Sequence, residues 1–231
     1  MHLFYQHELP AVKHLDVEES KHCVKVLRQQ GGDLINIIDG KGSFYEARIT
    51  NANHKKCEFE IIKTSQETSS PFHRHLALAP TKNMDRIEWL VEKATEIGVD
   101  EISFFQSFHS ERKIIKIDRL EKKVISAMKQ SLKAKKPILN EILSFSKIVE
   151  NVKAENRLIA YVDFDNEVLM KNELINQQDT LILIGPEGDF TTEEVEQAIS
   201  KGFKKVSLGR SRLRTETAAL AAVHLMSLAI E

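Results

Sequence analysis

LILIGPEGDFTTEEV, at residues 181–195, is the stretch that decides the fold. Leu181–Ile184 is a continuous apolar run typical of a strand buried on both faces, and the GPEG tetrapeptide ends it abruptly. The two glycines of that tetrapeptide permit positive φ and close backbone approach, while Pro186 fixes its own φ and has no N–H group. Thr191 and Glu194 have the spacing of a capping box, which predicts the start of a helix. The stretch therefore predicts a strand, a rigid loop and a helix, although an ordinary strand-to-helix turn would give the same pattern.

A second stretch with the same plan, VSLGRSRLRTETAALAA, follows at residues 206–222. Lys205–Leu208 is a short strand, Gly209 ends it, and three arginines then precede a helix whose candidate N-caps are Thr215–Thr217. A helix start behind arginines favours anions such as carboxylate or phosphate, although solvated surface arginines are the plainer interpretation. Open α/β sheets bind ligands beyond the carboxyl ends of their strands, so the two loops together predict a ligand site.

The chain from about residue 71 onwards alternates strand and helix patterns. Apolar residues spaced for one helix face, with Gly98 as C-cap of the first helix, predict two further helices. The expected strands are His75–Ala79, Ile102–Phe105 and Leu158–Val162, and the expected helices begin at Asp85 and at Asp118, the latter running to Lys135. This alternation predicts an α/β fold with a parallel sheet covered by helices.

The first seventy residues read as short strands separated by polar turns. Strands are expected at residues 34–40, 44–49 and 57–62, with one helix between Glu18 and Arg28. Close strands and short turns indicate a small β-barrel. The polar segment Gln66–Pro71 ends in a proline and is the best linker candidate. We therefore expect two domains, at residues 1–70 and 71–231.

Composition excludes several classes of protein. A hydrophobic content of 42% over 231 residues is ample for a packed core. Cys23 and Cys57 lack CxxC spacing, so neither a zinc site nor a disulfide framework is predicted. The sequence has no apolar stretch long enough to span a bilayer and no signal-peptide pattern at its start. We expect a cytoplasmic protein with no membrane segment and no bound metal.

Positive charge is concentrated in two segments, although the formal net charge is only −1. Residues 112–136 contain ten basic and two acidic side chains, and residues 201–214 contain six basic and no acidic ones. Such segregation is the electrostatic footprint of phosphate binding, whereas a solvated helix face is the alternative interpretation. The charge pattern therefore favours a nucleic-acid partner.

The two loops also carry a family resemblance. GPEGDF at residues 185–190, followed by LGRSRLRTETA at residues 208–218, resembles the SPOUT class of S-adenosylmethionine-dependent RNA methyltransferases. Within that class it is similar to the ribosomal small subunit methyltransferase E family, which methylates N3 of a uridine in 16S rRNA. The resemblance extends over nearly the whole chain, through Val26–Arg28, Gly32–Asp33, Thr81–Lys82, Asp85–Val99, Ser110–Arg112 and Gln130–Ser131. It implies a PUA-like RNA-binding barrel, a SPOUT domain with a C-terminal trefoil knot, and a homodimer.

The resemblance also implies a set of functional residues. Those lining S-adenosyl-L-methionine would be Leu183, Ile184, Gly185, Pro186, Glu187, Gly188, Leu208, Gly209, Leu213 and Arg214, with Leu158–Val162 and the loop after it as the remaining wall. Those contacting phosphates of 16S rRNA would be Arg28, Lys82, Arg86, Lys129, Lys133 and Lys136. Arg112 and Arg214 are candidate stabilisers of the uracil oxygens, and Glu216 is the best acidic candidate for a base or orienting group. A first-turn carboxylate that stabilises its helix is an equally good interpretation of Glu216.

Some positions depart from the family pattern. Ser211 stands where an arginine is frequent and Arg212 where an aliphatic residue is common. After Gln130–Ser131, the usual glycine-arginine pair is replaced by Leu132–Lys133, which keeps the charge and loses the bidentate geometry of arginine. Two other functions remain open, a noncatalytic RNA-binding or ribosome assembly protein and a related methyltransferase that acts on tRNA.

Overall fold

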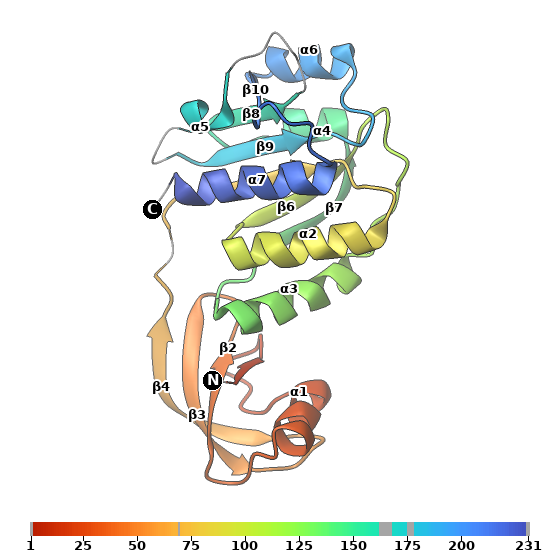
Figure 1. Cartoon of the computed structure of the whole chain (residues 1–231). Coiled ribbons are helices and arrows are strands. Elements are labelled where there is room, and N and C mark those ends of the chain that lie inside the picture. The colour runs from red at the N-terminus through yellow and green to blue at the C-terminus, as the bar shows by residue number, and fades with distance from the viewer. Residues whose placement is uncertain (1, 69, 162–167, 175–177, 230–231) are drawn as a thin grey trace. The chain divides into compact units, whose positions relative to one another are not determined.

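Two separate β-sheets organise the chain in the computed structural model, which describes residues 2–68, 70–161, 168–174 and 178–229 (Figure 1). Residues 1–69 and 125–136 form one unit, and residues 70–124 and 137–231 form the other. The elements of the first unit are β1 (Leu3–Tyr5), α1 (Val17–Lys21), the π-helix η1 (His22–Val26), β2 (Leu34–Ile38), β3 (Ser43–Asn51), β4 (Glu58–Gln66) and the end of α3 (Ile117–Ser131). The second unit contains the start of α3 with β5 (Arg74–Leu78), α2 (Met84–Ile97), β6 (Glu101–Gln106), β7 (Ile138–Ser144), α4 (Phe145–Glu150), β8 (Asn156–Ala160), α5 (Met170–Glu173), β9 (Thr180–Ile184), α6 (Thr192–Ser200), β10 (Lys204–Val206) and α7 (Thr215–Leu228).

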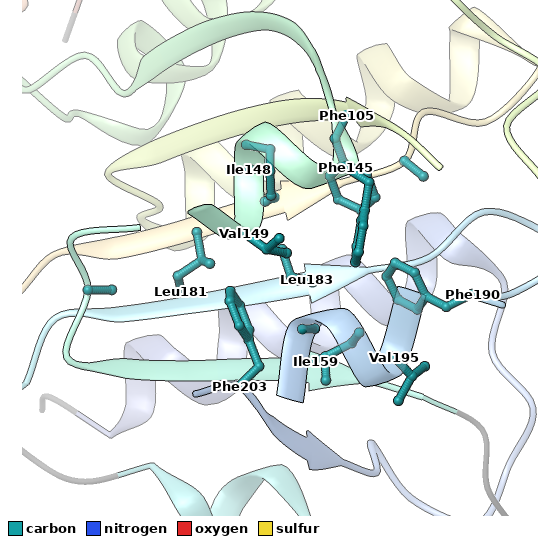
Figure 2. Packing of buried hydrophobic residues seen from close by; sticks show 14 residues of the cluster. Phe105, Phe145, Ile148, Val149, Ile159, Leu181, Leu183, Phe190, Val195 and Phe203 are labelled. Carbon is teal, nitrogen blue, oxygen red and sulfur yellow. The ribbon is translucent and has the colours of Figure 1, made fainter. Parts of the chain in front are cut away.

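The six-stranded sheet of the second unit has the order β10-β8-β9-β5-β6-β7, and every neighbouring pair is parallel. This arrangement confirms the predicted α/β fold. All five residues of β9 are buried, as the apolar run Leu181–Ile184 predicts for a strand covered on both faces. On one face, Leu181 and Leu183 pack with Phe145, Phe190 and other apolar side chains of α4, α6 and the neighbouring strands (Figure 2).

The topology of this sheet places two loops at a switch point. From β5 the chain passes through α2 to β6, on one side of β5. From β9, which pairs with β5, the chain passes through α6 to β10, which lies in the opposite direction along the strand order. Neighbouring strands whose connections leave in opposite directions open a crevice beyond their carboxyl ends. The GPEG loop follows β9, so it lies at this crevice.

The helices begin and end largely where sequence signals place them. The capping box of Thr191 and Glu194 is present at the start of α6, and Gly98 ends α2 with a φ of 118°. The N-cap of α7 differs from the prediction: it is Arg214, with no side-chain cap, instead of a residue in Thr215–Thr217. Thr215 does not cap the helix because its hydroxyl donates to the carbonyl oxygen of Gly185. α7 packs against α2, β5 and β9 (Figure 1).

The first unit is built on the four-stranded sheet β1-β2-β3-β4, in which β1 is parallel to β2 and the other pairs are antiparallel. Strands β2, β3 and β4 correspond to the three predicted strands. The predicted single helix between Glu18 and Arg28 is the short α1 followed by the π-helix. Residues 125–136 belong to this unit: the carbonyl of Ala134 accepts from Gly42 N at 3.1 Å, and Lys136 N donates to the carbonyl of Gly40 at 2.9 Å.

Three elements of the second unit were not predicted, β7, α4 and α5. β7 is an edge strand with four of its seven residues exposed, so it lacks the apolar run by which buried strands are identified.

In the described part of the chain, no helix is long and apolar enough to cross a bilayer. Those same residues contain no group of three or more His, Cys, Asp or Glu side chains suited to a metal ion.

Candidate active site at the carboxyl edge of the parallel sheet

The loop after β9 is a tight turn that leaves little room for a side chain at two positions, both occupied by glycine. A Cβ atom on Gly185 would lie 3.1 Å from two ring atoms of Phe190, and one on Gly188 would lie 3.0 Å from Cβ of His109. Neither glycine uses the positive φ that it permits, since the positive φ of this loop, 62°, belongs to Asp189. The close side chains of Phe190, Asp189 and His109, and not positive φ, therefore favour glycine at these two positions.

The loop after β10 uses its glycine differently. Gly209 has a φ of 119°, a left-handed conformation that favours glycine, and no atom lies within 4 Å of a Cβ built on it. Leu208 and Leu213 are half-buried, whereas Arg214 is exposed. Ser207 N donates to the carbonyl of Val168 at 2.8 Å. This loop therefore leaves open space at the Cα of Gly209 and carries an exposed guanidinium, while the N–H and the carbonyl of Gly209 are each 3.2 Å from the Ser207 hydroxyl.

A direct hydrogen bond brings the two loops together. The hydroxyl of Thr215, at the start of α7, donates to the carbonyl of Gly185 at 3.2 Å. The backbone of β5 joins the same place, since Ala79 N donates to the carbonyl of Ile184 at 3.0 Å. The predicted meeting of residues 185–188 with residues 209–217 is thus present in the structure. The predicted third wall, the loop after Leu158–Val162, lies outside the described residues from 162 to 167.

A third loop, after β6, is tied to the same edge. The Glu194 carboxylate accepts from the hydroxyl of Ser107 at 3.0 Å and from Phe108 N at 2.9 Å, in addition to its capping-box bond. The imidazole Nδ1 of His109 lies 3.0 Å from the carbonyl oxygen of Asp189. Sequence reasoning identified Glu194 only as a capping residue. Its second role joins residues 86 positions apart, and no local pattern predicts it.

Arg112 lies at the switch point and is engaged with backbone. Its Nε donates to the carbonyl of Thr81 at 3.0 Å, and an Nη donates to the carbonyl of Lys82. Lys82 itself forms an ion pair with Glu111 at 2.8 Å. Arg112 therefore joins the loop after β5 to the loop after β6.

Glu216 occupies the first turn of α7 and is almost fully buried. One of its oxygens lies 3.6 Å from Nε of Arg86 on α2. Its other oxygen, Oε2, is buried without a hydrogen-bond partner in the part of the chain that the structure describes. Both residues line a surface hollow of about 340 Å³ together with Asp85, Trp89 and Thr217.

Several basic residues expected to form an RNA-binding surface are paired with carboxylates. Arg119 and Lys123 on α3 form ion pairs with the buried carboxylate of Glu88 on α2. In the first unit, the Lys129 ammonium pairs with Glu19, a carboxyl whose pKa is raised mainly by burial. The other predicted RNA contacts of that unit are Arg28, which is exposed, and Lys133 and Lys136, which are half-buried.

Comparison with known proteins identifies the family. The family model described as RNA methyltransferase domain matches residues 68–227, and the RNA methyltransferase PUA domain matches residues 15–62. The ribosomal RNA small subunit methyltransferase E of Mesomycoplasma hyopneumoniae is 31% identical over 202 residues, covering 85% of this chain and 86% of that relative. The chain belongs to the ribosomal RNA small subunit methyltransferase E family.

Solved structures of similar proteins match this chain over nearly its whole length. A probable rRNA-methyltransferase from Porphyromonas gingivalis is 43% identical, covers 99% of both chains and gives a TM-score of 0.90. The Neisseria gonorrhoeae member, solved bound to S-adenosyl methionine, is 30% identical, with 100% of this chain and 98% of that one covered and a TM-score of 0.86. Membership confirms the resemblance found in the sequence, while the trefoil knot and the homodimer stay predictions.

Proposed function

We propose that this protein transfers a methyl group from S-adenosyl-L-methionine to N3 of a uridine in the 16S rRNA of the small ribosomal subunit. The observation that carries the proposal is the hydrogen bond from Thr215 to Gly185, which joins the two motif loops at the switch point of the sheet in a member of this family. Ligands of open α/β sheets bind at such a switch point.

The chemistry of the two loops fits the methyl donor. When bound, S-adenosyl-L-methionine supplies an electrophilic methyl group on a positively charged sulfur, beside an adenine ring and a zwitterionic tail. Residues 183–188 carry no basic side chain, so they present no like charge to that sulfur. The open space at Gly209 suits close approach of the adenine ring, and the exposed guanidinium of Arg214 suits the carboxylate of the tail.

Methylation at N3 requires removal of the proton on that nitrogen and stabilisation of the resulting anion. Glu216 is the candidate proton acceptor, because it lies one residue after the hydroxyl that contacts Gly185. Arg214 is a candidate donor to the uracil oxygens. Two N–H groups of Arg112 are already donated to carbonyl oxygens, so its main contribution is to hold the loops after β5 and β6 in place.

The proposed partner is 16S rRNA or the small ribosomal subunit, and the proposed location is the cytoplasm. N3 lies on the pairing edge of uracil, so the target base must be unpaired or flipped out of its helix. Arg28, Lys133 and Lys136 of the first unit and Arg86 and Lys82 of the second are retained as candidate RNA contacts. A homodimer completes the proposal by family resemblance.

Two measurements separate this function from its alternatives. Calorimetry with S-adenosyl-L-methionine should give saturable binding, whereas a noncatalytic RNA-binding or assembly protein should give no heat. Primer extension on rRNA from cells lacking the protein should lose one polymerase stop, because N3 methylation blocks base pairing. An unchanged 16S rRNA pattern together with a lost modification in tRNA would assign the activity to tRNA instead.

A further inference from the structure

The hollow between the first turns of α2 and α7 has an unusual combination of side chains. Trp89 is 46% exposed, which is uncommon for the largest aromatic residue, and it is the only tryptophan of the chain. Next to it lie the guanidinium of Arg86 and the carboxylate of Glu216, 3.6 Å apart. An aromatic face, a cation and a carboxylate thus surround a space of about 340 Å³.

Within the part of the chain that the structure describes, the carboxylate of Glu216 has an unsatisfied hydrogen-bond acceptor at this hollow. Its side chain is 10% exposed, and its Oε2 is buried without a donor among the described residues. Leaving a buried carboxylate oxygen without a hydrogen bond is costly, since the group has lost its water. The nearby Arg86 reaches only the other oxygen, at a distance beyond that of a good hydrogen bond. A donor supplied by a bound molecule would remove this cost.

Uracil has the complementary groups. Its pairing edge carries one N–H donor, at N3, between two carbonyl oxygens, and its ring stacks on aromatic side chains. The buried Glu216 oxygen needs a donor, the Arg86 guanidinium offers donors, and Trp89 offers a flat apolar face. Cytosine presents an unprotonated N3 beside an amino group, so it would set an acceptor against the carboxylate and leave that oxygen unsatisfied.

We propose that this hollow receives the flipped uracil, with Trp89 stacking on the ring, Glu216 accepting the N3 proton and Arg86 donating to a uracil oxygen. The proposal rests on the function proposed above and assigns Arg86 to the base instead of to a phosphate. It also places the base next to the cofactor loops, because Glu216 directly follows the Thr215 hydroxyl bonded to Gly185.

Methyl transfer then begins at N3 of the bound uracil. The N3–H bond breaks, the proton goes to the Glu216 carboxylate, and the electron pair stays on N3. The negative charge spreads to the two uracil oxygens, where the Arg86 guanidinium stabilises it. N3 forms a bond to the methyl carbon, and the carbon–sulfur bond breaks with its electron pair moving to sulfur, which leaves a neutral thioether.

The single tryptophan makes the first test site-specific. Trp89 fluorescence of the full chain is followed while short oligouridylate, oligocytidylate or an oligomer of N3-methyluridine is added, with S-adenosylhomocysteine present so that no turnover occurs. Stacking predicts quenching by oligouridylate at lower concentration than by either other oligomer. The Glu216→Gln variant should lose most of this preference, since it no longer offers a carboxylate to N3–H.

Steady-state kinetics on rRNA from cells lacking the protein provides the second test. Glu216→Gln and Arg86→Gln should each lower kcat by about 100-fold, as expected for loss of a general base or of charge stabilisation. Trp89→Leu should raise KM for RNA about tenfold, whereas Trp89→Phe should stay within about threefold because it keeps an aromatic face. Glu92→Gln, which changes an ion pair of α2 with Lys93, is the matched control and should leave both constants unchanged.

Three results would count against the proposal. Wild-type methylation of rRNA without any response of Trp89 to oligouridylate would overturn it while leaving the proposed function intact. A Trp89 signal that changes only with protein concentration, together with a lower sedimentation mass for Trp89→Leu, would show that a second copy of the chain covers the hollow. Absence of methyl transfer to rRNA by the wild type would instead remove the proposed function.

Discussion

The loops at the carboxyl edge of the parallel sheet and the basic residues of α3 are held in place by different means. The loops after β9 and β10 are fixed mainly through backbone: a tight turn at Gly185 and a left-handed glycine at 209, with short side-chain links from Thr215 and His109. The basic residues of α3 are fixed by side chains that meet carboxylates far away in sequence, such as Lys129 with Glu19. Adding atoms should therefore damage the first region, and removing a charge should damage the second.

The difference also changes how the basic residues are understood. Lys129, Arg119 and Lys123 each have a carboxylate partner, so at least three of the ten basic side chains in residues 112–136 are paired within the chain. By contrast, Lys113, Lys116 and Lys122 form no ion pair with any residue that the structure describes. Some basic side chains of this segment therefore stabilise the fold, and others are available to bind phosphate. The structure distinguishes the two groups, whereas the sequence does not.

Lys129→Ala should have the largest effect on stability. It leaves the buried Glu19 carboxyl without its cation, and breaking a buried pair in this way costs about 3 kcal/mol of unfolding free energy. Urea denaturation measures the loss. Lys122→Ala, at an exposed position of the same helix, is the control and should change the free energy by less than about 0.5 kcal/mol. Equal effects of the two variants would mean that the Lys129–Glu19 pair does not stabilise the fold. The double variant Glu19→Gln with Lys129→Ala should recover part of the lost unfolding free energy.

Gly185→Ala tests the opposite property, intolerance of added atoms. The new methyl group would lie 3.1 Å from the Phe190 ring and 3.2 Å from a carboxylate oxygen of Asp189, an overpacking that costs about 2 kcal/mol. Because the loop must shift, S-adenosyl-L-methionine binding measured by calorimetry should weaken about tenfold or more. Gly31→Ala has no atom within 4 Å of the added carbon and should leave both quantities unchanged. Normal cofactor affinity in Gly185→Ala would contradict the placement of the site.

A pH titration examines a second side-chain pair, formed by His73 and Glu101 at 2.8 Å. This hydrogen bond is the main cause that raises the pKa of His73 and lowers the pKa of Glu101. The contribution of His73 to the free energy of unfolding is complete below about pH 6.5 and is lost as pH rises through its raised pKa. The contribution of Glu101 is lost as pH falls below about 4.3 and through its lowered pKa. His73→Ala should therefore cost about 1 kcal/mol near pH 6, after allowing for the exposure of both side chains, and less above pH 8.

The measurement is the unfolding free energy of wild type and variant at several pH values, with the exposed His2→Ala as control. The neighbouring His75, whose pKa burial lowers to about 4, destabilises both proteins as pH falls below about 6.5, and this contribution cancels in the difference between wild type and variant. A cost of His73→Ala that is independent of pH would show that the pair contributes packing without charge.

Leu132→Gly should have the smallest effect, and it should be favourable. Leu132 has a φ of 56°, a left-handed conformation that favours glycine, and an exposed side chain. Relief of the left-handed conformation is worth about 1–2 kcal/mol and is partly offset by the entropy of glycine, so stability should rise by about 0.5 kcal/mol. Thermal unfolding would detect the gain as a small increase in Tm, and a lower Tm would show that the leucine side chain stabilises its surroundings.

Sequence reasoning succeeded where the physical signal is local. The apolar run of β9, the capping box of α6 and the glycine that ends α2 each depend on neighbours within a few residues, and all three are present. It failed where the partner is remote: Glu194 as a tether of the loop after β6, Arg112 as a donor to two carbonyls, and Glu19 opposite Lys129. Ion pairs and tethers across 30 to 110 residues leave no periodicity or spacing to detect.

The contribution of residues 125–136 to the first unit has a practical consequence. Glu67, near the end of that unit's first segment, accepts hydrogen bonds from Ala134 N and Lys135 N, and Glu19 depends on Lys129. A fragment cut after residue 69 would lose all of these partners and expose a carboxyl that is buried in the intact chain. Isolating the first unit for binding studies would require residues 125–136 to be joined to residues 1–69, because a single cleavage point does not separate the two units.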